Sequence, residues 1–79
     1  MQRNSLSIWT VYQKPLDYPG HFVARRWENL IVDGAPVSRA TADVLVAPDL
    51  DGLRAQLPAG LVRLDRQPGD GPVIVESWL

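Results

Sequence analysis

His21 is the only histidine of this chain, so a catalytic centre that depends on an imidazole would have to use it. It follows a turn that also carries Asp17. A histidine near a carboxylate on a turn is more often a solvated surface residue than half of a catalytic pair, and no catalytic motif accompanies this one. A small enzyme or metal-dependent hydrolase centred on His21 is therefore the weakest of three functional hypotheses.

The acidic residues form only loose pairs. Asp49 and Asp51 suit the capping of a helix and its N-terminal dipole. Asp65 and Asp70 flank a Gly/Pro-rich loop that lacks the alternating ligands of a calcium-binding EF-hand. Gly69-Asp-Gly71 lacks the lysine and the following helix of a phosphate-binding loop. The chain has no cysteine, which excludes disulfides and thiolate zinc sites. The sequence thus predicts no catalytic residue, no metal site and no bound cofactor.

Large rings and arginines give a stronger signal. Five of the six aromatic residues lie between Trp9 and Trp27. The segment Arg25-Arg26-Trp27 joins residue types that recur as hot spots of protein interfaces. In a small domain such rings also supply much of the core. We favour the core for Trp27, and we expect at least one of the three tryptophans to be partly exposed, because tryptophan is seldom buried on all sides.

The elements that must position these residues follow from residue type and periodicity. Ser7 to Gln13 and Phe22 to Ile31 are rich in β-branched and aromatic residues and predict a hairpin of two strands, joined by a Pro/Gly-rich turn. An Asp-Gly turn follows at residues 33–34, then an exposed connection and a short apolar strand, Asp43 to Ala47.

The only convincing helix is Leu50 to Leu57, with Asp49 as its N-cap and leucines 50, 53 and 57 on one face. Two more strands follow, Leu61 to Asp65 and Val73 to Trp78. The strand-helix-strand order allows the strands at 43–47 and 61–65 to run parallel. The sequence therefore predicts an α+β fold: a mostly antiparallel four- to five-stranded sheet with one short helix packed on one face.

Strand alternation divides the aromatic segment between two faces. We assign the bulkier set to the core beneath the helix: Trp9, Val11, Val23, Arg25 and Trp27. The other set comprises Ile8, Thr10, Tyr12, Phe22, Ala24 and Arg26. One short helix leaves the second face uncovered. The predicted binding surface consists of residues on that face or in the turn, namely Tyr12, Tyr18, His21 and Arg26.

Length and charge narrow the class of protein. The 79 residues suffice for a single domain, in which we expect residues 1–7 to be flexible. The net charge of −1 is unlike that of a duplex nucleic-acid binder. The N-terminus lacks the apolar core of a signal peptide, and no apolar run is long enough to span a bilayer. We expect a cytoplasmic protein that does not enter a membrane.

Part of the chain resembles short hypothetical proteins encoded in bacterial genomes. The resemblance rests on Trp9-Thr-Val-Tyr12, Asp17-Tyr-Pro19, Phe22-Val-Ala-Arg25 and Trp27, and it continues to Trp78. That group carries no assigned activity. The resemblance therefore implies a bacterial or mobile-element origin, and it implies neither catalytic residues nor a ligand.

Two hypotheses lead. The first is a non-catalytic protein-interaction module or adaptor that binds a protein partner or a second copy of itself through the open sheet face or an edge strand. The alternative is binding of single-stranded nucleic acid or a nucleotide, in which bases would stack on the aromatic rings beside Arg26.

Overall fold

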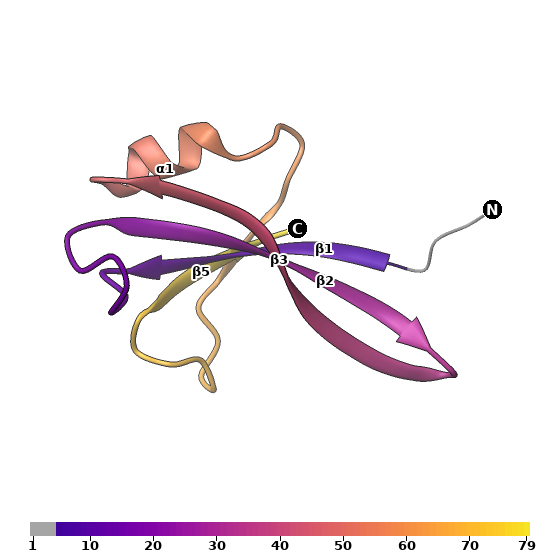
Figure 1. Ribbon diagram of the computed structural model, residues 1–79. Coiled ribbons are helices and arrows are strands. Elements are labelled where there is room, and N and C mark those ends of the chain that lie inside the picture. The colour runs from indigo at the N-terminus through magenta and orange to yellow at the C-terminus, as the bar shows by residue number, and fades with distance from the viewer. Residues whose placement is uncertain (1–4) are drawn as a thin grey trace.

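The computed structural model describes residues 5–79, which form a five-stranded antiparallel sheet with one short helix on one face (Figure 1). The elements are β1 (Ser5–Gln13), β2 (Phe22–Val32), β3 (Ala35–Ala47), α1 (Leu50–Gln56), β4 (Arg63–Asp65) and β5 (Ile74–Trp78). The strand order is β3-β2-β1-β5-β4, so β1 is central and β3 and β4 are the edges. The predicted α+β fold is confirmed.

β1 begins earlier than predicted. Ser5–Ser7, which the sequence analysis assigned to a flexible N-terminal extension, belong to this strand. The other residues of that expected extension lie outside the described part of the chain.

The register between β1 and β2 differs from the predicted one. Trp9 is paired with Arg26, and Ile8 with Trp27. Directly paired residues share a face, so Trp9 and Trp27 lie on opposite faces of the sheet. The face that α1 covers, here called the helix face, carries Trp9; the other, the open face, carries Trp27.

The predicted faces are therefore wrong in β2. A one-residue shift of register moves every side chain of a strand to the other face, and the long loop of residues 14–21 does not fix the register as a two-residue turn does. Val23, Arg25 and Trp27 belong to the open face, whereas Phe22, Ala24 and Arg26 belong to the helix face.

The turn between β2 and β3 is the predicted Asp-Gly turn. Asp33 and Gly34 have φ values of 50° and 79°, as a two-residue hairpin turn requires. β3 then runs from Ala35, so the segment predicted as an exposed connection is the first half of an edge strand. The first half of this strand lacks the usual sequence pattern, because it consists mainly of small and polar residues and contains Pro36. An edge strand needs few apolar side chains and tolerates proline.

β4 lies at the far edge from β3 and pairs with β5 in antiparallel orientation. The predicted parallel pairing of the third and fourth strands is therefore wrong. The chain after α1 crosses to the opposite edge of the sheet instead of returning beside β3 (Figure 1).

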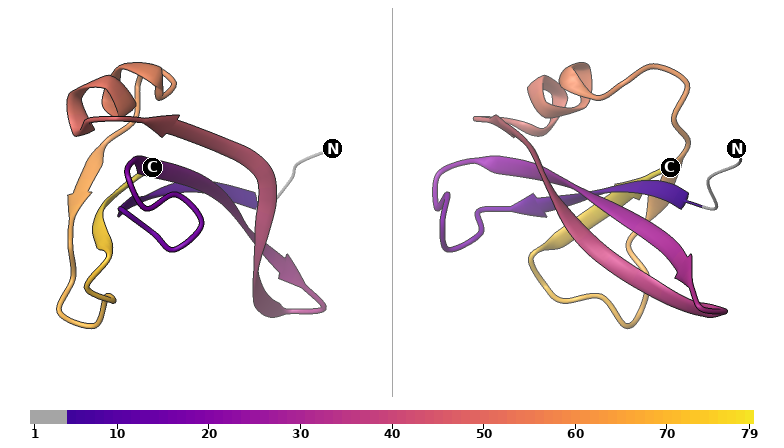
Figure 2. Two further views of the ribbon diagram at one scale, coloured as in Figure 1. Left: turned by 60° about the vertical axis from the view of Figure 1, so that its left-hand side comes forward. Right: turned by 45° about the vertical axis from the view of Figure 1, so that its right-hand side comes forward.

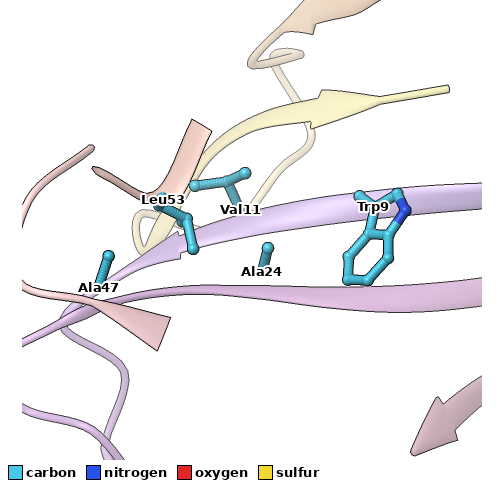
Figure 3. Close-up of a cluster of buried hydrophobic side chains, with 5 residues drawn as sticks. All are labelled: Trp9, Val11, Ala24, Ala47 and Leu53. Carbon is cyan, nitrogen blue, oxygen red and sulfur yellow. The ribbon is translucent and has the colours of Figure 1, made fainter. Parts of the chain in front are cut away.

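The core lies between α1 and the helix face. The side chain of Asp49 accepts a hydrogen bond from the Gly52 N–H at 2.6 Å, which confirms the predicted N-cap. Leu53 of α1 is fully buried against Val11 and Ala47 (Figure 3). Trp9 lies farther along β1 in the same cluster and is 7 % exposed.

The sheet is bent into an arch. Figure 2 shows α1 on its outer side, while the loop between β1 and β2 hangs on the inner side. The open face is therefore concave, and the one helix of the described chain lies on the opposite face.

Candidate binding site: a cleft on the open face

The open face carries a cleft of about 310 Å³, which is near the lower end of the range for ligand pockets. Its lining combines two aromatic rings, two isoleucines and several hydrogen-bonding side chains: Ile8, Thr10, Tyr12, Trp27, Asn29, Ser38, Asp70, Ile74 and Ser77. Four strands and one loop therefore contribute to this site.

Cross-strand pairing brings the lining together. Ile8 is opposite Trp27 across β1 and β2, and Tyr12 is opposite Ile74 across β1 and β5. Partners in such pairs lie side by side on one face. The apolar lining thus forms two cross-strand pairs, with Thr10 between them on β1 and with Asn29 opposite Ser38 on the polar border.

Two loops close the ends of the open face. Asp17, in the loop between β1 and β2, forms an ion pair with Arg25 on the open face. Val23 is fully buried at this end although no helix covers it. At the other end, the loop before β5 brings Asp70 to the cleft. Its turn is held by a hydrogen bond of 2.9 Å from the Gln67 N–H to Asp70 Oδ2.

The predicted binding residues do not form one surface. Tyr12 lines the cleft, as expected for the uncovered face. Tyr18 is 38 % exposed in the loop between β1 and β2, and His21 is exposed at the end of that loop. Arg26 lies on the helix face, so the structure separates it from Tyr12 by the thickness of the sheet.

Arg26 has a structural role. Its guanidinium donates a hydrogen bond of 2.6 Å to Asp43 and one of 2.9 Å to the hydroxyl of Ser7. These contacts join β1, β2 and β3. The Thr41 hydroxyl donates to the Arg26 carbonyl at 3.0 Å and accepts from the Asp43 N–H at 3.2 Å, where the pairing of β2 and β3 shifts. The side chain that sequence reasoning assigned to binding therefore stabilises a β-bulge.

Glu76 is the one buried charged residue of the described chain, at 3 % exposure on the helix face. Arg54 of α1 donates to both of its carboxylate oxygens, at 2.6 and 3.0 Å, and the Trp78 indole donates at 2.7 Å. The hydrogen bond from Arg54 is the largest of the effects that lower the pKa of Glu76, and burial opposes it. Because every partner is internal, this cluster anchors the helix and offers nothing to a ligand.

Sequence reasoning missed most of the cleft. Trp27 was assigned to the core because the register of β2 was wrong. Asn29 and Ser38 could have been paired from the Asp-Gly turn, which fixes the register of β2 and β3. Asp70 had no signal, because it comes to the cleft from a loop distant in sequence.

Within the described range, no cluster of three or more histidine, cysteine, aspartate or glutamate side chains is placed to hold a metal ion. None of the helices described is long and apolar enough to cross a membrane.

Comparisons of this chain with protein-family models, with curated proteins and with solved structures find no significant match, so the cleft's own geometry is what supports a functional proposal.

Proposed function

We propose that this protein is a non-catalytic protein-interaction module, and that it binds its partner through the open face. The observation that carries the proposal is the cleft, where Tyr12 and Trp27 stand on a concave face that no helix covers. The partner is another protein chain or a second copy of this one.

The composition of the cleft supports this proposal. The centres of protein interfaces are enriched in tryptophan and tyrosine and are bordered by polar groups. Here two aromatic residues and two isoleucines line the cleft, with Asn29, Ser38 and Ser77 able to form hydrogen bonds. The two rings are partly exposed, and burial of their exposed area against a partner would contribute about 25 cal/mol per Å².

The edges of the sheet are less suited to binding than its face. β3 is long, but Pro36 lacks an N–H and a bulge interrupts the strand near Asp43. Arg39 is also well exposed on it, at 63 % of its side chain. Prolines, bulges and charged residues are the features that protect edge strands from pairing. β4 is only three residues long. The open face is therefore favoured over an edge strand as the binding surface.

The nucleic-acid alternative has less support. A nucleic-acid site needs cations near its stacking rings to meet the phosphates. Within residues 5–79, no arginine or lysine lines the cleft. The two arginines of β2 are already paired with acidic residues. Arg25 is paired with Asp17, and Arg26 is paired with Asp43 on the helix face.

The test introduces the same charged side chain on either side of the sheet. Ser77→Arg places a guanidinium in the cleft without removing a core side chain, and Ala55→Arg places one on the exposed surface of α1. Self-association is measured by light scattering over a range of concentrations, and partner binding by quantitative affinity purification from the native host. Ser77→Arg should abolish the interaction, whereas Ala55→Arg should preserve it. Equal binding by the two variants would refute the proposal.

A further inference from the structure

Among the residues that the structure describes, Asp70 is the only acidic one that lines the cleft, and no basic one lines it. The lining therefore includes one acidic residue together with two aromatic ones. This combination is a recognised arrangement for cations, because the faces of tryptophan and tyrosine rings are electron-rich and a carboxylate supplies the opposite charge.

The carboxylate of Asp70 has no cationic partner within the described chain. Asp43, Glu28 and Glu76 are each within 4 Å of an arginine, and so are three further acidic residues, Asp17, Asp51 and Asp65. The other two acidic residues lie in a turn and at a helix N-cap, Asp33 and Asp49 respectively. Of the described acidic residues, Asp70 alone lines the cleft, and it forms no ion pair.

Asp70 is also held in place. Its Oδ2 atom accepts the Gln67 N–H at 2.9 Å, and its backbone carbonyl accepts from Arg66 at 3.1 Å. Arg66 thus contacts the backbone of Asp70, and none of the ion pairs of the described chain joins it to the Asp70 carboxylate. A carboxylate fixed in this way needs little reorganisation to receive a ligand.

We propose that the cleft binds a basic side chain, arginine or lysine, presented by the protein partner. The cation lies against the rings of Tyr12 and Trp27 and pairs with the Asp70 carboxylate. The inference rests on the proposed function, because it names the chemistry by which the same site recognises its partner. Arginine is the better fit of the two, since its planar guanidinium stacks on an indole and binds a carboxylate through two parallel hydrogen bonds.

The size and border of the cleft agree with a side chain as the occupant. Its volume of about 310 Å³ is small for a cofactor. The amide and hydroxyl groups of Asn29 and Ser38 at its border, and the hydroxyl of Thr10 on the central strand, can pair with the backbone of an extended segment.

The first test compares two probes of one shape. Nα-acetyl-arginine methylamide and its citrulline counterpart are titrated into the ¹⁵N-labelled protein. The arginine probe should shift the Trp27 indole resonance and the amides of Ile8 and Ser77. The citrulline probe, which lacks the charge, should bind about three- to tenfold more weakly, as expected for loss of a cation–π contact and an ion pair. Equal binding of the two probes, or binding of neither, would overturn the inference.

The second test removes the charge from the protein. Asp70→Asn keeps an oxygen that can accept the Gln67 N–H, and Asp65→Asn removes the same charge from an exposed position on the helix-face side of β4. Asp70→Asn should weaken binding of the arginine probe and of the partner about three- to tenfold, whereas Asp65→Asn should change neither. If Asp70→Asn binds the partner normally while Ser77→Arg does not, the interaction module stands and the basic side chain is refuted. If Ser77→Arg also binds normally, the proposed function fails with it.

Discussion

At the scale of single residues, the clearest feature is a charge kept inside a very small core. Glu76 is buried beneath α1, yet its carboxylate has three internal hydrogen bonds, from Arg54 twice and from Trp78. A buried ion pair adds little to stability by itself, because desolvation opposes the attraction. Removing one partner is costly, since it leaves the other charge without compensation.

Glu76→Gln should therefore lower the free energy of unfolding by roughly 2 kcal/mol. The glutamine amide keeps one acceptor oxygen but presents its NH₂ group to the donors of Arg54 or Trp78. Urea unfolding followed by circular dichroism measures the loss. Asp65→Asn is the control, because the side chain of Asp65 is 87 % exposed and its pair with Arg63 is solvated. A loss in Glu76→Gln no larger than in this control would contradict the structural role.

The same pair predicts a pH dependence. The hydrogen bond from Arg54 holds the pKa of Glu76 in the folded protein below the ordinary value of 4.5. The pair therefore contributes fully at pH values above about 4.5, and its contribution is lost as the pH falls through the lowered pKa. The difference in stability between wild type and Glu76→Gln should narrow below pH 4.5. A difference that stays constant into strong acid would exclude this explanation.

At the scale of elements, α1 shows how far local sequence signals reach. The N-cap and the apolar stripe of the helix were both predictable, because each depends on neighbours within one or two turns. The glycine at position 52 was not. A Cβ atom there would lie 2.9 Å from Asp49 Oδ1, the atom that accepts the Gly52 N–H. Glycine is a poor helix former, but at position 52 it leaves room for the Asp49 carboxylate that caps the helix.

This contact predicts that the effects of two substitutions are coupled. Asp49→Ala should cost about 1 kcal/mol. Gly52→Ala should be nearly neutral in the native chain, because the gain of up to about 1 kcal/mol in helix propensity is offset by displacement of the cap. In the Asp49→Ala background, the same substitution should stabilise by most of that amount. A double-mutant cycle from urea unfolding measures the coupling. Gly20→Ala, which has open space around its Cβ position, should combine with Asp49→Ala additively. Additivity at Gly52 as well would refute the explanation.

Between elements, the sequence was informative only where the connection is short. The Asp-Gly turn fixes the register of β2 on β3, whereas the loop of residues 14–21 leaves the register of β1 on β2 open. The strands themselves, the single helix and the α+β class were predictable from periodicity. The face of Trp27, the length of β3 and the position of β4 depend on pairing between distant segments. The predictions of all three features were wrong. The cleft depends on the same pairing, so of its lining only Tyr12 was identified as a binding residue.

At the scale of the whole molecule, the two faces of the sheet have different roles. The helix face holds the buried cluster around Leu53 and Val11, and the open face holds the cleft. A chain of 79 residues has a net stability of only about 4 to 12 kcal/mol, so loss of a large core side chain removes much of that stability. The open face is where large rings are available for binding.

Two tryptophan substitutions test this division directly. Trp9→Ala removes a ring that is 7 % exposed and should cost about 3 to 5 kcal/mol, a large share of the net stability. Trp27→Ala removes a ring that lines the cleft and is only partly buried, so we expect roughly half that loss, a retained fold and loss of partner binding. Circular dichroism during urea unfolding and the dispersion of amide resonances report the fold without relying on tryptophan fluorescence. If Trp27→Ala destabilises as strongly as Trp9→Ala, the open face is a second core, and the surface on which the proposed interaction depends does not exist.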